Sequence, residues 1–424
     1  MNEIDMSILF DKYNEAFVVI KDRFDLLYKE FVVLGEANPI EFIKYRIKKP
    51  DSIAMKLVKK SLPFTTENIE SGVNDIIGVR IVCSFLSDLE TLKEVIRAME
   101  KSGELTIINE KDYVNKPKDS GYSSYHMIVK IPVMIRNEVI DIKTEIQIRT
   151  IAMDMAASLE HKLMYKKEKI NYIYANQLDD TFEFCSKLDN DMNNLVRENN
   201  NFSDNSVFDI PMFMRDYEYK KMKLKYEAAL NKMKNKLNNL YISYEKNGIV
   251  NPIEHIKVRL KDDEAIVRKL VLNDRELTLE NVENFVNDIA GVRIVCSFLS
   301  DLEELKEIIR SDPELSIVKE KDYVTNPKEN GYRGYHLIVG VPVYLSNGFT
   351  LIKVEIQIRT IAMEMWDSLE QKICYHKKTT ENTKEELKRL SSVISEIDDN
   401  VNGIVASLKL NNGVKKRVKK KFDN

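Results

Sequence analysis

The chain has 424 residues, of which 43% are hydrophobic and 31% are charged. It can therefore bury a sizeable core, and it is long enough for two or three domains. It has 65 Lys and Arg residues and 68 Asp and Glu residues, which give a net charge of −3. This balance excludes a polycation that coats nucleic acid. The cysteines form no C-x-x-C pair, which argues against a disulfide framework or a Cys-rich zinc site; they are Cys83, Cys185, Cys296 and Cys374.

The predicted elements of the N-terminal half form one series. A helical stretch over about 4–34 comes first, and Asn-Pro then opens a shorter helix at 40, because Pro suits the first helical turn. The β-branched run GVRIVCSF from Gly78 predicts a buried strand, and Ser87-Asp-Leu-Glu predicts a helix that begins with a capping box. Strands follow over about 104–113, 124–135 and 139–149, and a helix begins near Ile151. This order predicts an α+β fold, a mixed β-sheet flanked by helices.

The whole series is then repeated. Asp75 to Glu90 differs from Asp288 to Glu303 only at Ile77 and Ala290. Two further blocks recur about 210 residues later: Lys111 to His126 matches Lys321 to His336, and Glu145 to Met155 matches Glu355 to Met365. A period this long indicates the tandem duplication of a domain rather than a solenoid. The second copy accordingly predicts helices over 214–247, from 253 and from Ile361.

The composition divides the chain into domains. We predict a first domain over 1–198, a linker over the polar, Asn-rich residues 199–211, a second domain over 212–408 and a basic tail over 409–424. The run VKKRVKKKF in the tail favours a solvated, disordered end and leaves a contact with RNA open. No apolar run approaches the roughly 18 residues of a membrane span, and the first residues do not resemble a signal peptide. We therefore expect a cytoplasmic protein without a membrane partner.

Acidic residues of two predicted strands are the candidate catalytic groups. Alternation along a strand places Glu145, Gln147 and Arg149 on one face, with isoleucines on the other. Asp75 lies just before the neighbouring strand, so its carboxylate and that of Glu145 could together hold Mg²⁺ and leave positions for phosphate. Asp288 and Glu355 are the equivalents in the second copy. The alternatives are an ordinary half-exposed strand and a simple turn aspartate.

A loop rich in lysine and tyrosine is the candidate nucleotide-binding segment. Lys111, Lys118, Tyr122 and His126 fall within 16 residues, where lysines can bind phosphates and a tyrosine can stack on a base. Arg46 and Lys48 add two cations near a helix end. Ordinary surface lysines and a solvated helix face are the alternatives. The sequence has no P-loop and no G-x-G-x-x-G fingerprint. It also has no His-Asp dipeptide, which argues against a His/Asp metal-dependent phosphohydrolase.

Taken together, these motifs resemble the synthetase domain of RelA/SpoT-type alarmone synthetases, in particular the small (p)ppGpp synthetases. The ordered set is R-I-K…S…K, D-I-x-G-V-R, K-D-Y…P-K-x-x-G-Y…Y-H and E-I-Q-I-R-T, over about 36–168 and 249–378. The resemblance implies a nucleotidyltransferase-like fold. It also implies Mg²⁺-dependent transfer of pyrophosphate from ATP to the 3′-hydroxyl of GDP or GTP, which is GTP pyrophosphokinase activity.

The resemblance also assigns roles to residues. The metal-holding and catalytic carboxylates would be Asp75, Glu145, Asp288 and Glu355. The ATP-binding residues would be Arg46, Lys48, Ser52, Lys56 and Arg80, with Arg259, Lys261, Lys269 and Arg293 in the second copy. The GDP- or GTP-binding residues would be Lys111, Lys118, Tyr122, His126 and Gln147, with Lys321, Lys328, Asn330, Tyr332, His336 and Gln357 in the second copy.

The two copies depart differently from the family pattern. In the acceptor loop, the first copy has Ser120 and Ser123 in place of the usual Asn and long polar residue, and the second copy has Gly334 in place of the usual Ser. The second copy has Asp262-Asp263-Glu264-Ala265 where triphosphate should approach, and like charges there oppose ATP binding. We therefore expect the first copy to be the better ATP site and the better catalyst. For the second copy, activity of its own and a regulatory or structural role both stay open.

Other functions and partners stay open. The acceptor could instead be an adenine nucleotide or the 3′ end of tRNA, or the protein could bind nucleotide or RNA without catalysis. The two copies could pack as an intrachain pseudo-dimer, and the chain could form a homo-oligomer. Trp366 stands where the family often has Trp, whereas the first copy has Ala156.

Overall fold

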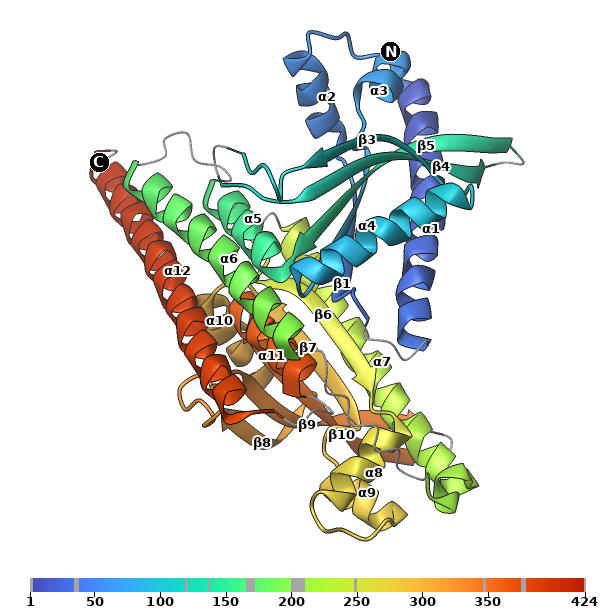
Figure 1. Ribbon diagram of the computed structural model, residues 1–424, viewed down its shortest axis with the longest axis vertical. Helices are drawn as coiled ribbons and strands as arrows, with labels where there is room; N and C mark the ends of the chain where they lie inside the picture. The colour runs from blue at the N-terminus through green and yellow to red at the C-terminus, as the bar shows by residue number, and fades with distance from the viewer. Residues whose placement is uncertain are drawn as a thin grey trace. The chain divides into compact units, whose positions relative to one another are not determined.

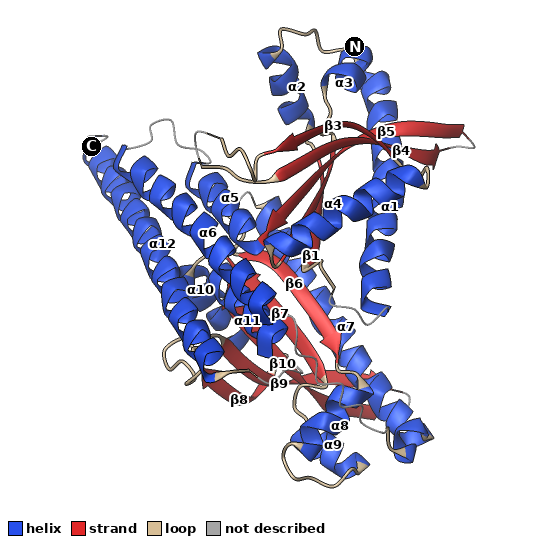
Figure 2. Cartoon of the chain, viewed as in Figure 1, coloured by secondary structure: helices blue, strands red, loops and turns tan. Residues whose placement is uncertain are grey.

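The computed structural model describes residues 3–33, 38–118, 121–135, 138–164, 172–199, 210–247, 250–345, 348–374 and 379–422. It divides into two compact units, one of Met1–Glu160 and Glu168–Leu195, the other of His161–Lys167 and Val196–Asn424. The helices and strands are labelled in Figure 1 and coloured by type in Figure 2. Each copy of the repeat contains one five-stranded mixed sheet flanked by helices, which confirms the predicted α+β class.

The first sheet has the strand order β1-β2-β5-β4-β3. Strands β2 and β5 are parallel, and the other neighbouring pairs are antiparallel. The elements are α1 (Glu3–Val33), β1 (Phe42–Ile47), α2 (Pro50–Lys59), α3 (Thr66–Gly72), β2 (Ile77–Cys83), α4 (Leu86–Lys101), β3 (Thr106–Asp112), β4 (Tyr125–Ile135), β5 (Glu138–Thr150), α5 (Ile151–Met164) and α6 (Tyr172–Asn199). The predicted first helix, the four later strands and the helix from Ile151 are confirmed.

The second sheet repeats the first, with the order β6-β7-β10-β9-β8 and the same strand directions. Its elements are η1 (Met212–Arg215), α7 (Tyr217–Lys246), β6 (Ile253–Leu260), α8 (Asp263–Val271), α9 (Leu279–Phe285), β7 (Ala290–Cys296), α10 (Leu299–Arg310), β8 (Ser316–Asp322), β9 (Tyr335–Leu345), β10 (Gly348–Thr360), α11 (Ile361–Cys374) and α12 (Glu381–Phe422). The duplication seen in the sequence is therefore a duplication of topology.

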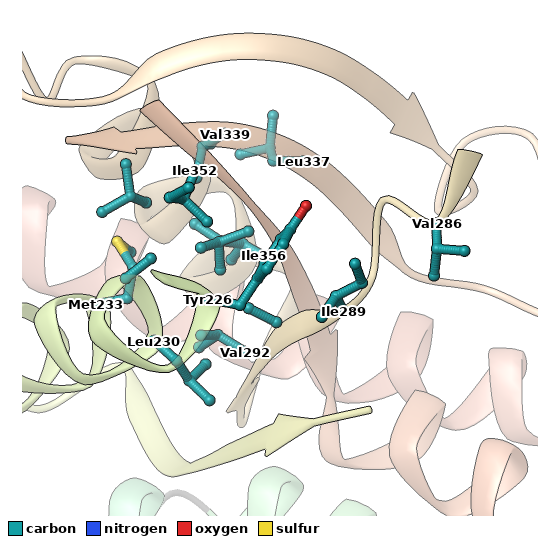
Figure 3. Close-up of a cluster of buried hydrophobic side chains, with 14 of the residues drawn as sticks. Tyr226, Leu230, Met233, Val286, Ile289, Val292, Leu337, Val339, Ile352 and Ile356 are labelled. Carbon is teal, nitrogen blue, oxygen red and sulfur yellow. The ribbon is translucent and has the colours of Figure 1, made fainter. Parts of the chain in front are cut away.

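One face of each sheet is apolar and carries the core. In the second unit, Tyr226, Leu230 and Met233 of α7 pack with Val292 of β7 and Ile356 of β10, and Figure 3 shows this cluster. In the first unit, buried residues of α1, such as Tyr13 and Ile20, and of α4, such as Leu92, form the corresponding cluster on the apolar face of the first sheet. Because side chains alternate along a strand, burial of one face leaves the polar residues on the other.

Two sequence expectations about helix starts are wrong. Asn-Pro opens no helix at 40 or 253, since β1 begins at Phe42 and β6 at Ile253. The period-two alternation of FIKYRI decides in favour of a strand, and the shorter helix α2 begins only at Pro50. Ser87 is also not an N-cap, because α4 begins at Leu86 after Phe85.

The N-terminus of α4 is capped from a distant part of the chain. The backbone N–H of Ser87 donates to Oδ1 of Asn193 on α6 at 3.0 Å. The first backbone N–H groups of a helix have no partner within the helix. Here a side chain from α6 satisfies one of them in place of a local N-cap. The corresponding helix α10 also begins one residue before its serine, at Leu299.

The end of the chain also differs from expectation. The run from Val414 to Phe422, for which the sequence favoured a disordered end, belongs to α12. Of the predicted linker 199–211, residues 200–209 lie outside the described residues. Among the helices that the structure describes, none is both long and apolar enough to cross a lipid bilayer.

Candidate active sites

The polar face of the first sheet carries a row of functional side chains in register. Lys44 of β1 pairs with Arg80 of β2, Arg80 with Gln147 of β5, Gln147 with His126 of β4, and His126 with Lys111 of β3. Directly paired residues point to the same face of a sheet. Predicted ATP-binding and GDP-binding residues are therefore brought onto one surface, although they are far apart in the sequence.

Glu145 is the centre of a hydrogen-bond network on this face. Its Oε1 lies 3.2 Å from Nδ1 of His126, and its Oε2 accepts from Nε2 of Gln147 at 2.8 Å. Nε2 of His126 lies 2.9 Å from the Tyr122 hydroxyl, which accepts from Nη2 of Arg149 at 2.6 Å. With a proton on Nδ1 of His126, the chain of contacts from Arg149 to Glu145 is hydrogen-bonded throughout. Both oxygens of Glu145 are thus held in fixed positions.

The electrostatic surroundings keep Glu145 ionised. Burial acts to raise its pKa, but hydrogen bonding and charge from His126, with the hydrogen bond from Gln147, outweigh burial and lower the pKa below its ordinary value. The side chain is 14% exposed. Glu145 is therefore a carboxylate at neutral pH, and it can accept a proton or a cation.

Asp75 precedes β2 and is held by two lysines. Lys48 Nζ lies 2.5 Å from its Oδ2, and Lys56 Nζ on α2 lies 2.8 Å from its Oδ1. Burial acts to raise the pKa of Asp75, but the two lysines outweigh it and lower the pKa. Asp75 is therefore no simple turn residue; it collects the cations of the predicted ATP-binding segment.

Arg46 joins the two acidic residues. Its Nη2 lies 3.9 Å from Oδ2 of Asp75 and 3.5 Å from Oε2 of Glu145. This close approach depends on Gly78, the β2 partner of Arg46, because a Cβ there would lie only 3.0 Å from Nε of Arg46. The guanidinium of Arg46 thus reaches both carboxylates, so Asp75 and Glu145 lie close enough to share one cation.

The donor set fits Mg²⁺ bound together with phosphate. Mg²⁺ takes hard oxygen ligands, and proteins usually supply one or two carboxylates while substrate phosphates and water complete the octahedron. Asp75 and Glu145 supply two such carboxylates within reach of one cation. Among the described residues, no group of three or more His, Cys, Asp or Glu side chains is gathered as a metal cage. The protein thus offers ligands of the right kind for a metal that arrives with a nucleotide.

A buried acid missed by the sequence analysis organises the cations of the row. Asp154, on the first turn of α5, accepts from Arg80 at 3.0 Å and Arg149 at 3.2 Å, and Lys44 lies 3.4 Å away. Its side chain is 2% exposed. The available signal was an acidic residue inside the apolar helix start Ile-Ala-Met-Asp-Met-Ala-Ala. A buried acid needs paired charges, so Asp154 fixes where Arg80 and Arg149 lie.

The loop before β4 holds Tyr122 among aromatic and cationic groups. The ring of Tyr122 makes an edge contact with Tyr113, and Nζ of Lys118 lies 4.5 Å from the Tyr122 ring centre. Lys118 is exposed, so it can move to a ligand's phosphate and leave the tyrosine ring to a base. Ser120 lies outside the described residues. Ser52 lies half-buried on the first turn of α2.

The second copy reproduces most of this geometry. Glu355 lies 3.2 Å from His336 and accepts from Gln357 at 2.8 Å, while Asp288 is held by Lys261 at 2.7 Å and Lys269 at 2.6 Å. The chain from Arg359 through Tyr332 to His336 is also present. The equivalent of Asp154 is Glu364, which contacts Lys257, Arg293 and Arg359.

The copies differ around Arg293 and Tyr332. Asp367, an alanine in the first copy, adds a second carboxylate 3.3 Å from Arg293 and also pairs with Arg359. Trp366 packs against Tyr332, with ring centres 6.0 Å apart, and Tyr332 is only 6% exposed. Within the described part of the chain, Arg259 makes no ion pair with Asp288 or Glu355, whereas Arg46 reaches both equivalents.

The remaining predicted residues lie at the edge of each site. Lys111 and Lys321 are exposed on β3 and β8, opposite His126 and His336. Lys328 covers the ring of Tyr332 at 4.6 Å. The Asn330 side chain makes hydrogen bonds within the protein: its Nδ2 lies 3.5 Å from Glu370, and its Oδ1 accepts from the N–H of Tyr332.

Comparisons with known proteins agree with this organisation. The profile described as the region found in RelA / SpoT proteins matches residues 45–170 and 258–380. GTP pyrophosphokinase YwaC of Bacillus subtilis is 42% identical over 200 residues, which are 46% of this chain and 93% of that protein. GTP pyrophosphokinase YjbM of the same organism is 33% identical over 193 residues, which are 45% of this chain and 90% of that protein.

Solved structures of Bacillus subtilis proteins were also found. The small alarmone synthetase 1 bound to its product pppGpp is 32% identical, with a TM-score of 0.43, over 45% of this chain and 98% of that one. The small alarmone synthetase 2 is 41% identical, with a TM-score of 0.41, over 45% of this chain and 99% of that one. Because the family profile covers more than half of the chain in two separate stretches, the protein belongs to the RelA/SpoT family and carries the family's region twice.

Proposed function

We propose that this protein is a GTP pyrophosphokinase that makes (p)ppGpp, and that its first copy is the catalyst. The observation that carries the proposal is the reach of one guanidinium nitrogen, Nη2 of Arg46, to both Asp75 and Glu145. A reaction between two nucleotides needs their phosphates and hydroxyl held in line, with charge opposite the developing negative charge. Family membership and the names of the two relatives support the same activity.

The proposed reaction transfers pyrophosphate to a ribose hydroxyl. The 3′-oxygen of GDP or GTP attacks the β-phosphorus of ATP, an O–P bond forms, and the bond between the α,β-bridging oxygen and the β-phosphorus breaks to release AMP. Glu145 takes the proton of the attacking hydroxyl, since it is ionised and its position is fixed by His126 and Gln147. Lys48 and Lys56 lie around Asp75, where they can bind the triphosphate together with Ser52 of the same segment.

Asp75 and Glu145 would hold Mg²⁺ in this site. The bound metal would neutralise phosphate charge and so make the phosphorus easier to attack. Arg80, fixed by Asp154, and Arg46 offer planar guanidinium groups on which the adenine can lie. Tyr122 offers its ring to guanine, with Lys118 beside it. We also propose the domain bounds 1–198 and 212–408, with each domain folding around one site.

The two copies can be separated by matched substitutions. ATP labelled at the γ-phosphate is incubated with GDP, GTP, GMP, ATP or tRNA and Mg²⁺, using the wild-type chain, Asp75→Ala and Asp288→Ala. We expect labelled product from GDP and GTP, an almost complete loss in Asp75→Ala and a smaller loss in Asp288→Ala. Loss in Asp288→Ala with survival in Asp75→Ala would assign turnover to the second copy. Product formed only from an adenine nucleotide or tRNA would change the acceptor.

A further inference from the structure

We propose that the second copy binds the acceptor nucleotide, a guanosine di- or triphosphate, but not ATP, so that it is a nucleotide-binding site without turnover. The proposal rests on the function proposed for the first copy. Its basis is that the two halves of the second site differ in kind. The acceptor half keeps the hydrogen-bond chain from Arg359 to Glu355, and the donor half carries anions where a triphosphate would lie.

The acceptor half repeats the hydrogen-bond chain of its counterpart, except that Gly334 replaces Ser124 and leaves Nε of Arg359 without the partner that Nε of Arg149 has. Arg359 donates to the Tyr332 hydroxyl at 2.7 Å, that hydroxyl lies 2.5 Å from His336, and His336 contacts Glu355. Exposed Lys328 lies 4.6 Å from the ring centre of Tyr332, so this flexible side chain can bring its charge to a phosphate.

The acceptor loop is also fixed by two later helices. Ser391 of α12 donates to the carbonyl of Gly331 at 2.6 Å, and Arg333 donates to Ser395 of α12 at 2.5 Å. Trp366 of α11 supports the edge of Tyr332. A loop that is held in one conformation loses less entropy when a ligand binds. The second copy thus has a preorganised site for the acceptor.

The donor half is altered at the start of the helix after the first strand. In the first copy, α2 starts after Lys49 with no side-chain cap among the described residues, and Ser52 offers a hydroxyl. In the second copy, Asp262 replaces Lys49, and its carboxylate accepts from the N–H of Ala265, the Ser52 equivalent, at 2.7 Å. The N–H of Ser52 donates instead to the carbonyl of Lys49 at 3.0 Å. The second copy thus places a carboxylate at a helix start where the first copy has a lysine, and this carboxylate opposes the approach of a phosphate.

The charge of the segment changes in the same direction. Residues 46–56 have four cationic side chains and one acidic one, a net charge of +3. Residues 259–269 have four cationic and three acidic side chains, a net charge of +1. Lys261 and Lys269 pair with Asp288 just as Lys48 and Lys56 pair with Asp75, so the difference in charge comes from the added acids. Triphosphate binding depends on an excess of cations, and the second copy has much less of it.

One of these acids is held in place by a contact that the second copy alone can make. Asp263 accepts from the Tyr219 hydroxyl at 2.6 Å and from Lys223 at 2.9 Å, both on α7. Lys223 also donates to the carbonyl of Lys261 at 2.8 Å. These contacts hold the N-terminus of α8 against α7 and keep the carboxylate of Asp263 in position. Because these acids cannot easily turn away, we expect ATP affinity lower than in the first copy by on the order of tenfold or more.

Binding without turnover tests the proposal on the full-length chain. AMPCPP, an ATP analogue with a methylene group between its α- and β-phosphates, and GDP are titrated separately by calorimetry with Mg²⁺. We expect one AMPCPP and two GDP per chain, with Tyr332→Ala and Tyr122→Ala each removing one GDP. Two AMPCPP sites of equal affinity, or one GDP lost only in Tyr122→Ala, would overturn the proposal.

Reciprocal substitutions provide matched controls. Asp262→Lys with Ala265→Ser is expected to raise the AMPCPP stoichiometry from one to two, and Lys49→Asp to lower it to zero. Asp262→Ser keeps a good N-cap without the charge, so it excludes helix loss as the cause. If the stoichiometry stays at one in both Asp262 variants, the anions are not the reason and the proposal fails. Failure of the proposed reaction would instead appear as no product from ATP and GDP, with these stoichiometries unchanged.

Discussion

Arg80 and Asp154 are 74 residues apart in sequence, and the guanidinium of one lies 3.0 Å from the carboxylate of the other. Arg80 lies on a central strand and Asp154 on the first turn of the helix that follows β5. The pair fixes the side chain that we propose to bind adenine. Lys44 and Arg149 share the same acid.

Removal of the acid should therefore destabilise the first unit. Asp154→Ala leaves three cations around a buried position without their counter-charge, and the expected cost is about 3–5 kcal/mol of unfolding free energy. Asp154→Glu should lose much less, because Glu364 makes the same contacts in the second copy. Urea unfolding measures both, and the KM for ATP should rise in any Asp154 variant that folds. Equal stability of Asp154→Ala and the wild type would contradict this account.

Gly78 is predicted to be needed for full ATP affinity, although it has no side chain. A Cβ at this position would lie 3.0 Å from Nε and 3.1 Å from Cγ of Arg46, so Gly78→Ala should displace Arg46. The Arg46 side chain has to give way by a few tenths of an ångström, so we expect a loss of a few-fold, well below the roughly hundredfold cost of a 1 Å misplacement. Gly291→Ala makes the same change in the copy that we propose has no turnover, and it controls for effects of the substitution outside the first site. Steady-state kinetics should show a loss in the first variant and little change in the second.

The hydroxyl of Tyr122 should matter for turnover more than for ATP binding. Tyr122→Phe removes the group that joins Arg149 to His126 and leaves two buried polar atoms without their partner. The cost of such an unsatisfied group is about 1–3 kcal/mol, and here it loosens the hold of His126 on Glu145. We expect a lower kcat with an unchanged KM for ATP. Tyr332→Phe is the matched variant and should leave kcat closer to that of the wild type.

Asp189 gives the first unit a stability that depends on pH. This buried acid of α6 accepts from the hydroxyl of Thr150 at 2.6 Å, and burial raises its pKa to about 7. In the unfolded chain its pKa is about 3.9, so between pH 4 and 7 the folded state keeps a proton that the unfolded state releases. Stability should thus fall as pH rises through this window, by up to roughly 1.4 kcal/mol per pH unit, and level off above pH 7.

The test is the substitution Asp189→Asn, which keeps the acceptor for Thr150 and removes the titration. Urea midpoints of the first unit measured from pH 5 to 8 should depend less on pH in the variant, and the gain over wild type should be largest at pH 8. Asp398, which accepts from Thr360 and also has its pKa raised to about 7 by burial, predicts the same behaviour for Asp398→Asn in the second unit. An unchanged slope in both variants would show that these acids are ionised in the folded protein.

The sequence determined the duplication, the strands after Asp75 and the facing of Glu145, Gln147 and Arg149, because strand periodicity and repetition are local properties of the chain. It misjudged the segments after Asn38-Pro39 and Asn251-Pro252, where alternation of side chains outweighs the helical preference of Pro. Only the tertiary structure decided that Arg46 reaches both Asp75 and Glu145, and that Asp154 holds three cations. These contacts join residues of different helices and strands, so the spacing of the residues in the sequence does not predict them. Burial requires the charges to be paired, and only the folded structure shows which charges pair.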